Sequence, residues 1–334
     1  MRLGIIGAGQ IVQEFLPKLV TLDGMEIIAI QSMPFEKRNV EKLCKKNGIP
    51  YSATSLEELL NYDIDTVYVA VPNFMHYTCS RNALEKGLNV IVEKPIASND
   101  REAKELKTLA TSKQLFCFEA VTTPYFDGYE KIRQWLGEIG KIKMVHCNYS
   151  QYSRRYDDFK AGVVLPAFDP TKSGGALMDL NLYNLHFVLG LFGMPQKYKY
   201  YPNIERNIDT SGTLVLQYPN FIGTCTAAKD CTAPYSFVIE GENGYITTQY
   251  PPNLIGEVTL KKRDGTIERY DDGMASQRLV PEFKFFIDCI NRQDFEACEK
   301  RLNQSISVSE VQTKARLEAG VFFPADKEKE KVNA

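Results

Sequence analysis

Over the first 120 residues, short apolar segments alternate with segments in which apolar residues recur at helical spacing. Alternating strands and helices predict right-handed βαβ crossovers, and therefore a parallel sheet covered by helices on both faces. We expect a doubly wound α/β domain over residues 1–120. The expected strands cover residues 2–8, 25–32, 65–72, 88–92 and 115–121, and the expected helices cover 11–22, 36–48, 55–61, 77–87 and 99–114.

The pattern changes after residue 121. Strand-like segments now follow one another, and the dipeptides Asn243-Gly244 and Asp264-Gly265 are typical of hairpin turns. This predicts a second, α+β domain over residues 121–326 with a largely antiparallel sheet, followed by a charged tail at 327–334. The expected strands lie within residues 141–153, 212–219, 222–229, 235–250 and 256–271, and the expected helices within 126–137, 176–192, 280–292 and 307–320.

The composition limits the class of protein. The 334 residues are 44% hydrophobic and 25% charged, and the formal net charge of −2 includes no basic surplus for nucleic acid. No apolar run reaches the roughly 20 residues that span a bilayer, and the N-terminus has no signal-peptide pattern. The eight cysteines form no C-x-x-C pair, which argues against a disulfide scaffold or a zinc site. We therefore expect a cytoplasmic protein without metal, nucleic-acid or membrane partners.

Gly7 and Gly9 stand between the first expected strand and the first expected helix. A dinucleotide-binding fold needs glycine there, at Gly7 for a tight turn and at Gly9 for the close approach of a pyrophosphate. Gln10 and Ile11 would begin the helix whose N-terminus holds that pyrophosphate, and Val12 occupies the third glycine position of the fingerprint. A plain structural turn is the alternative interpretation.

The end of the second strand bears on the choice of cofactor. NAD-binding proteins usually carry an acid there, which takes the ribose hydroxyls. This chain has Ser32 instead, with no acid before Glu36, and then Lys37 and Arg38. Ser32 and Arg38 could bind a 2′-phosphate, which favours NADP over NAD. The alternative is that Lys37 and Arg38 lie on the solvated face of a helix.

The third strand ends in Val71, Pro72 and Asn73, with His76 one turn further along. Ligand crevices form at the carboxyl ends of parallel strands, so this segment is expected to contact the cofactor. Asn73 could bind its ribose or amide group. His76 could equally be a polar residue in the first turn of a helix.

The next strand ends in Glu93 and Lys94, directly before Pro95. Both charged residues are expected at the same sheet edge, beside the nicotinamide end of the cofactor. A partly desolvated lysine next to a cationic ring is suited to proton transfer or to polarising a substrate oxygen. A proline can fix such a turn, and we hypothesise a cis bond between Lys94 and Pro95. Taken alone, the pair could also be a solvated lysine and a capping glutamate.

Polar residues recur on one face of the expected apolar helix after Gly174 and Gly175. Asp179 and Tyr183 are four residues apart, and His186 follows three residues later. Such residues within an apolar helix either line a site or are buried with partners. We expect Asp179, Tyr183 and His186 to bind substrate, and a satisfied polar cluster in the core is the alternative.

These motifs, in the order "GIIGAGQIV", "VAVPNFMH", "EKPIA" and "GGALMDLNLYNLH", resemble the Gfo/Idh/MocA family of NAD(P)-dependent oxidoreductases. The resemblance extends over almost the whole chain. It implies an N-terminal Rossmann domain and a second domain with a large open, mainly antiparallel sheet that often forms homodimers or homotetramers. It also implies functional roles for Glu93, Lys94, Asp179 and Tyr183. With tyrosine at position 183, the chain resembles the dihydrodiol/xylose dehydrogenase and glucose–fructose oxidoreductase branches more than the inositol dehydrogenase branch, which has histidine there.

The chain departs from the family pattern at four positions. Asn181 replaces the usual glycine, His186 stands where aspartate is frequent, and Thr122 and Pro124 replace a tryptophan and an arginine of the dihydrodiol branch. These departures leave the substrate pocket undefined.

Arg154 and Arg155 are a further open assignment. They could bind an anionic or hydroxylated substrate, or they could form salt bridges at a subunit interface.

The expected function is NAD(P)-dependent hydride transfer between nicotinamide and a secondary alcohol or ketone of a sugar, cyclitol or related diol. Tyr183 is expected to act as the acid/base, with Lys94 assisting and Asp179 orienting the substrate hydroxyl. Two alternatives stay open: a non-catalytic NAD(P)-binding redox sensor, and an enzyme that uses transient oxidation by a tightly bound cofactor.

Overall fold

The computed structural model describes residues 1–327, so the expected charged tail lies outside the described residues except for Lys327. The chain divides into two compact units. The first unit contains residues 1–97, 101–121 and 279–306, and the second contains 98–100, 122–278 and the described residues from 307 onward.

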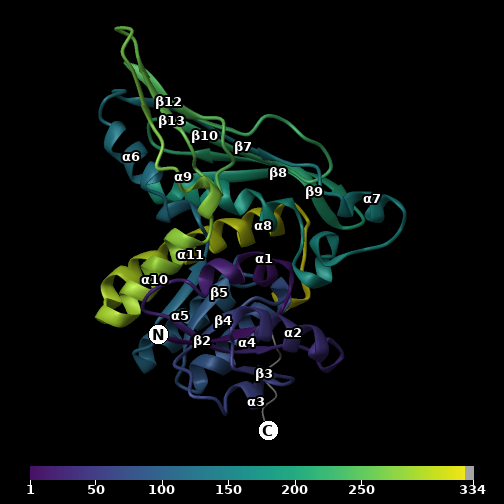
Figure 1. Ribbon diagram of the computed structural model, residues 1–334. Helices are drawn as coiled ribbons and strands as arrows, with labels where there is room; N and C mark the ends of the chain where they lie inside the picture. The colour runs from purple at the N-terminus through teal and green to yellow at the C-terminus, as the bar shows by residue number, and fades with distance from the viewer. Residues whose placement is uncertain (328–334) are drawn as a thin grey trace. The chain divides into compact units, whose positions relative to one another are not determined.

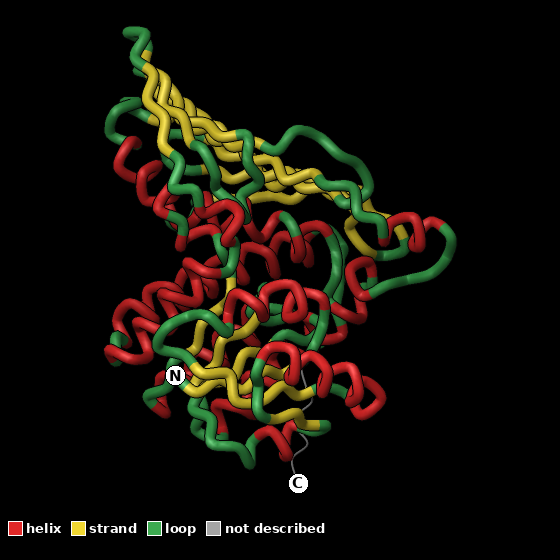
Figure 2. Tube along the Cα trace, viewed as in Figure 1, coloured by secondary structure: helices red, strands yellow, loops and turns green. Residues whose placement is uncertain are grey.

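The first unit is built on a six-stranded sheet in which every neighbouring pair of strands is parallel (Figures 1 and 2). The strand order β3-β2-β1-β4-β5-β6 changes direction between β1 and β4, which is where doubly wound folds bind ligands. The strands are β1 (Arg2–Ile6), β2 (Glu26–Gln31), β3 (Tyr51–Ala53), β4 (Thr66–Val69), β5 (Asn89–Glu93) and β6 (Cys117–Ala120). The connecting helices are α1 (Gln10–Leu19), α2 (Lys37–Asn47), α3 (Leu56–Leu59), α4 (His76–Glu85) and α5 (Asp100–Lys113).

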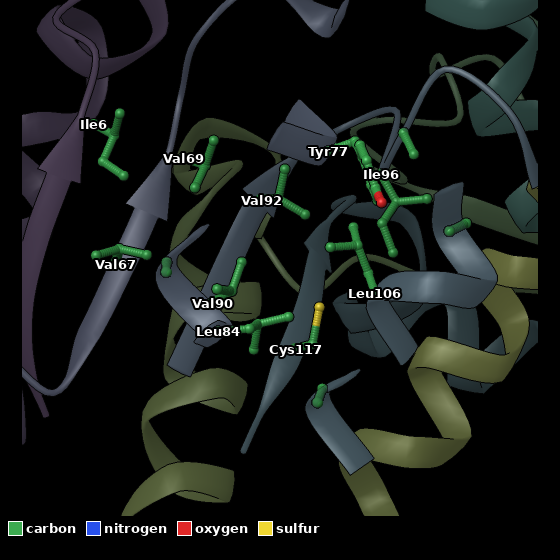
Figure 3. Packing of buried hydrophobic residues seen from close by; sticks show 14 of the residues in the cluster. Ile6, Val67, Val69, Tyr77, Leu84, Val90, Val92, Ile96, Leu106 and Cys117 are labelled. Atoms are coloured by element: carbon green, nitrogen blue, oxygen red, sulfur yellow. The ribbon is translucent and has the colours of Figure 1, made fainter. Parts of the chain in front are cut away.

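The central strands of this sheet are fully buried, and their apolar side chains pack against α4 and α5 (Figure 3). Burial of both faces explains why these strands read as continuous apolar runs in the sequence. The side chains labelled in Figure 3 are Ile6, Val67, Val69, Tyr77, Leu84, Val90, Val92, Ile96, Leu106 and Cys117.

Residues 279–306, from two helices near the end of the chain, belong to the first unit. The sequence had placed them in the second domain, expected over residues 121–326. Helix α10 (Val280–Arg292) places Phe283 edge-on against Tyr68 at 5.2 Å between ring centroids, and stacks Phe286 on Phe118 at 4.7 Å. Helix α11 (Phe295–Glu318) has residues in both units. The contribution of residues 279–306 depends on long-range aromatic packing, which sequence periodicity does not report.

The second unit is built on an eight-stranded sheet in the order β14-β13-β12-β11-β7-β10-β9-β8. The pair β7 and β10 is parallel and the other neighbours are antiparallel. The sequence did not reveal β8, an edge strand in which most residues are exposed and which contains Pro202. The strands are β7 (Ile142–Ser150), β8 (Lys197–Glu205), β9 (Ile208–Gln217), β10 (Ile222–Ala228), β11 (Ser236–Gly241), β12 (Gly244–Thr248), β13 (Val258–Lys262) and β14 (Ile267–Tyr270).

Helices cover one face of this sheet, with α9 against β7 and β10 and α8 against β9 (Figure 1). Along β7, Val145 and Cys147 are buried, while Met144 and His146, on either side of Val145, are half-buried. This alternation shows that the opposite face of the sheet carries no layer of helices within residues 1–327. The helices of the unit are α6 (Asp127–Trp135), α7 (Arg155–Lys160), α8 (Ala176–Asp179) and α9 (Asn181–Phe192).

All eight cysteines lie within residues 1–327 as free thiols, and only Cys231 is exposed. No helix in this range is both long and apolar enough to cross a membrane. In the same range, no group of three or more His, Cys, Asp or Glu side chains is placed to hold a metal ion.

Candidate active site

The turn after β1 has the geometry that a dinucleotide requires. Gly7 has φ = +102°, and a Cβ at this position would lie 2.3 Å from the carbonyl oxygen of Ala70. Gly9 has ordinary backbone angles, and a Cβ there would meet nothing within 4 Å. Gly7 is therefore required by the turn itself, whereas the absence of a side chain at Gly9 keeps open the space beside the helix.

Helix α1 begins at this open space. Among residues 1–327, no side chain caps its N-terminus, and its first turn holds no acidic residue. The N–H groups of Gln10 and Ile11 therefore belong to a helix end that favours an anion. The Gln13 side chain donates to the carbonyl oxygen of Ala8 at 2.8 Å, which fixes the loop, and Val12 is buried in the core. These residues fit a pyrophosphate.

The end of β2 presents no carboxylate before Glu36. Ser32 is only 2% exposed, and its hydroxyl donates to the carbonyl oxygen of Met33 at 3.4 Å. Lys37 and Arg38, at the start of α2, are exposed. Of these residues, only Lys37 and Arg38 therefore present an accessible side chain to a phosphate.

A cavity of about 290 Å³ lies between the dinucleotide loop and α2. Ala8 and Gln13 line one side, and α2 contributes Lys42 and Lys46. Glu36 also lines the cavity, and the two lysines outweigh its charge, which favours an anionic group there.

His76 is almost completely buried, at 1% exposure. Its Nδ1 lies 2.7 Å from the carbonyl oxygen of Pro95, and its Nε2 lies 2.8 Å from that of Val71. Burial lowers the pKa of His76, and a neutral imidazole can donate to only one of these two oxygens. His76 therefore bridges the ends of β4 and β5, whereas Asn73 and Val71 are half-buried and Pro72 is exposed. A contact between His76 and a cofactor stays a prediction.

The turn that carries Lys94 is held on both sides. The Lys94–Pro95 peptide bond is cis, as hypothesised from the sequence. The N–H group of Ile96 donates to Oε1 of Glu119 at 2.8 Å, and the carbonyl oxygen of Pro95 faces His76. Lys94 itself is half-buried. Its backbone is thus placed at the carboxyl edge of the sheet by buried polar partners on neighbouring elements.

Glu93 is anchored by the adjacent strand. The hydroxyl of Tyr68, on β4, donates to its carboxylate at 2.5 Å. The ring of Phe283 in turn packs against Tyr68. Glu93 is therefore a well-positioned residue at the end of β5.

The expected continuous helix over residues 176–192 is wrong. It is two helices, α8 and α9, separated at Leu180, where φ is −107° and ψ is −45°. Asp179 ends the first helix, so it does not share one continuous helix with Tyr183 and His186. Those two residues, three apart on α9, still lie on one helical face. Tyr183 is 7% exposed, and its ring lies 5.9 Å from that of Tyr149. His186 is 1% exposed.

Two buried asparagines fasten α9 to β10. The Asn181 side chain donates to the carbonyl oxygen of Cys225 at 2.9 Å, and that of Asn184 donates to the carbonyl oxygen of Thr226 at 2.9 Å. This role gives a physical reason for asparagine at position 181, where glycine was expected. A glycine there could not make the bond to β10.

Asp179 has a buried partner that the sequence pattern did not reveal. Nζ of Lys229 lies 2.8 Å from Oδ2 of Asp179, and the Lys229 side chain is 3% exposed against 30% for Asp179. Lys229 directly follows β10, at the end of the strand-like segment "IGTCTAAK". A lysine at the end of a strand is the same signal that drew attention to Lys94, although β10 is buried on alternate residues whereas β5 is buried along its centre.

Asp209, on β9, is a second buried acid that the sequence did not single out. Oδ2 of Asp209 accepts hydrogen bonds from the N–H group of Leu177 and from the hydroxyl of Tyr200, each at 2.7 Å. Burial raises the pKa of Asp209 to about 6. A Cβ on Gly175, where φ is +105°, would lie 2.1 Å from Oδ1 of Asp209. Asp209 therefore holds the start of the helix that ends in Asp179.

The remaining expected residues lie elsewhere in the second unit. The hydroxyl of Thr122 donates to the carbonyl oxygen of Asn253 at 2.8 Å, and Pro124 is buried in the same short segment. Arg154 and Arg155 are exposed at the start of α7. Neither a substrate contact nor an interface is assigned to them.

Two solved structures share this fold over nearly their whole length. KijD10, a 3-ketoreductase from Actinomadura kijaniata in complex with NADP and TDP-benzene, matches with a TM-score of 0.80 at 19% identity, over 97% of this chain and 98% of that chain. Levoglucosan dehydrogenase in complex with NADH and levoglucosan matches with a TM-score of 0.79 at 16% identity, over 96% and 97%. Identities this low show the fold alone.

Two relatives match by sequence over their full length. The chain is 29% identical over 330 residues to "scyllo-inositol 2-dehydrogenase (NADP(+)) IolU" of Bacillus subtilis (strain 168), covering 98% of this chain and 99% of the relative. It is 26% identical over 338 residues to trans-1,2-dihydrobenzene-1,2-diol dehydrogenase of Mus musculus, covering 98% and 99%.

Family models match both units. The model for the oxidoreductase family with an NAD-binding Rossmann fold matches residues 1–121, and the model for the GFO/IDH/MocA C-terminal domain matches residues 129–247. These matches confirm the predicted resemblance, the α/β fold class and the oxidoreductase class. The chain therefore belongs to the Gfo/Idh/MocA family of oxidoreductases with an NAD-binding Rossmann fold.

Proposed function

We propose that this chain transfers hydride between a nicotinamide cofactor and a secondary alcohol or ketone of a sugar, cyclitol or related diol. The proposal rests mainly on the Glu93–Lys94–Pro95 turn at the end of β5. Hydrogen bonds to Tyr68, His76 and Glu119 hold this turn in place. The full-length similarity to an inositol dehydrogenase and to a dihydrodiol dehydrogenase supports the substrate class.

The cofactor would be held by residues of the first unit. The N-terminus of α1, with the open space at Gly9, would take its pyrophosphate, and the strand ends at Asn73 and Lys94 would contact its nicotinamide half. When bound, the cofactor supplies the acceptor or donor of hydride.

The protein residues would supply binding and proton transfer. Lys94 would donate a hydrogen bond to the substrate oxygen, and Tyr183 would take the hydroxyl proton in oxidation or return it in reduction. Asp179 would accept a hydrogen bond from a substrate hydroxyl and so set its orientation. The burial of Tyr183 and the half-burial of Lys94 strengthen such interactions, because both side chains are shielded from part of the solvent.

We further propose that NADP is preferred over NAD. The exposed Lys37 and Arg38 and the lysines that line the cavity beside α2 favour an additional phosphate. The relative from Bacillus subtilis is named as NADP(+)-dependent.

We also propose that the open face of the second sheet joins two copies of the chain. Half-buried residues of the central strands, including Met144 on β7, Val215 on β9 and Val238 on β11, form this face. Partly exposed apolar residues across neighbouring strands are typical of protein interfaces.

The catalytic roles predict a specific loss in two variants. Tyr183→Phe and Lys94→Ala should each lower kcat by about 100-fold or more, because the first removes the proton-transfer group and the second removes the donor to the substrate oxygen. Their affinity for NADPH should change little, and titration of cofactor fluorescence measures it separately from turnover on a panel of cyclitols and sugars. Wild-type turnover in both variants would refute the assignment.

The cofactor site predicts a pair of contrasting glycine variants. Gly9→Val should fold, because its backbone angles suit any residue and its Cβ meets nothing, yet its side chain should fill the pyrophosphate space. Thermal-shift measurements should show stabilisation of the wild type by NADP and, more weakly, by NAD, and neither effect in Gly9→Val.

Gly137→Val is the matched control, because a Cβ at Gly137 also meets nothing within 4 Å and its φ is ordinary. It should respond to both cofactors as the wild type does. A stronger response of the wild type to NAD than to NADP would contradict the proposed preference.

The interface predicts a change in assembly. Val238→Glu places a charge at the centre of the open face, where Val238 pairs with His146 and Thr247 across the neighbouring strands. Sedimentation analysis should show a dimer or larger assembly for the wild type and a shift towards monomer for Val238→Glu. Lys160→Glu, an exposed position on α7, should assemble normally, and a monomeric wild type would refute the proposal.

A further inference from the structure

We propose that Lys229 is a positioning residue for the reaction, because it fixes the carboxylate of Asp179 and supplies its counter-charge. The inference rests on the proposed function, since the placement of Asp179 affects turnover only if that reaction takes place. All the contacts that support it lie within the second unit.

The ammonium group of Lys229 is surrounded by specific partners. Nζ lies 2.8 Å from Oδ2 of Asp179 and 2.8 Å from the carbonyl oxygen of Ala167, and it sits 4.7 Å from the ring centroid of Phe168. A lysine that is 3% exposed would be strongly unfavourable without such partners. The ammonium therefore has little freedom to leave Asp179.

The pair is asymmetric in a way that suits a functional carboxylate. Lys229 is buried, whereas 30% of the Asp179 side chain remains exposed. The cation thus holds the carboxylate from the protein interior and leaves part of it accessible. An ion pair that served only the core would have no reason to leave its acid exposed.

The backbone of Lys229 is fixed by the sheet. Its N–H group donates to the carbonyl oxygen of Thr210, on β9, at 2.8 Å, and its carbonyl oxygen accepts from the N–H group of Ser153 at 2.9 Å. On β9, Asp209 accepts the N–H group of Leu177 near the start of α8. Both ends of the helix that carries Asp179 are therefore tied to the neighbouring strands β9 and β10.

The same strand also places the helix of Tyr183. Asn181 and Asn184 bond to consecutive carbonyl oxygens of β10, at Cys225 and Thr226, and Lys229 follows three residues later. Strand β10 thus holds α9, after the break at Leu180, and Lys229 holds Asp179, just before it. Loss of the Lys229 charge should misplace Asp179 without detaching the helix of Tyr183.

The test compares Asp179→Asn, Lys229→Met, the double variant and the wild type. Turnover is measured with NADP⁺ and scyllo-inositol, and with the cyclitol and sugar panel if scyllo-inositol is not a substrate. Lys229→Met should lower kcat by about 100-fold, in line with the cost of a small misplacement in an active site. Its NADPH affinity should stay within about twofold of the wild type, and Lys229→Arg should recover part of kcat because it restores the charge.

The decisive comparison is between Asp179→Asn and the double variant. Lys229→Met leaves the Asp179 carboxylate without its cation, whereas the double variant removes both charges. The double variant should therefore fold even if Lys229→Met does not. If Lys229 acts through Asp179, adding Lys229→Met to Asp179→Asn should lower kcat by less than about threefold, because the two residues act as a unit. A further loss of tenfold or more would overturn the proposal, as would a folded Lys229→Met with wild-type turnover.

Lys160→Met is the matched control. Lys160 forms an ion pair of similar length with Asp157, at 3.0 Å, but both side chains are more than half exposed. Its loss should leave kcat within about twofold of the wild type.

A wild type that binds cofactor but oxidises or reduces none of the compounds would refute the proposed function. Thermal unfolding of the same four proteins would then test the structural half of the inference, the pairing of Lys229 with Asp179. Destabilisation that is much smaller in the double variant than the sum of the single effects would support the pairing. Additive effects would overturn it.

Discussion

The structure of the site depends on how polar groups are satisfied at the ends of buried strands. A buried N–H or C=O group without a partner is costly, so each strand end must find one. At the end of β5, Glu119 accepts the N–H group of Ile96, and His76 lies against the carbonyl oxygen of Pro95. These bonds leave the turn few alternative conformations, and they therefore fix the position of the Lys94 backbone. The same constraint acts at the end of β10, where Lys229 is held.

Much of the first unit could be predicted from the sequence, because a sheet buried on both faces leaves a strong signal in apolar runs. The glycines at 7 and 9 and the parallel sheet implied by βαβ alternation follow from local rules, and the cis bond hypothesised before Pro95 is present. The short edge strand β3, the exposed strand β8 and the return of α10 to the first unit do not. Each depends on long-range pairing or packing, which leaves no local periodicity.

In the candidate site, too, local features could be predicted from the sequence and long-range contacts could not. Asp179 and Tyr183 were recognisable as polar residues in an apolar segment, but the break at Leu180 was not. Nor were the long-range bonds by which Asn181 and Asn184 hold the second helix to β10. Lys229 lies fifty residues from Asp179 in sequence, so only the register of β10 brings the two together. Its position at the end of a strand-like segment was nevertheless visible, as it was for Lys94.

The central claim is that this chain moves hydride between a carbinol carbon and nicotinamide. The most direct measurement incubates the protein with NADP⁺ and with scyllo-inositol or sugars deuterated at their carbinol carbons, and then determines the mass of the reduced cofactor. The account predicts that deuterium appears on the nicotinamide ring and that turnover slows relative to the unlabelled compound. Bound cofactor that stays oxidised, or that is reduced without deuterium, would contradict it.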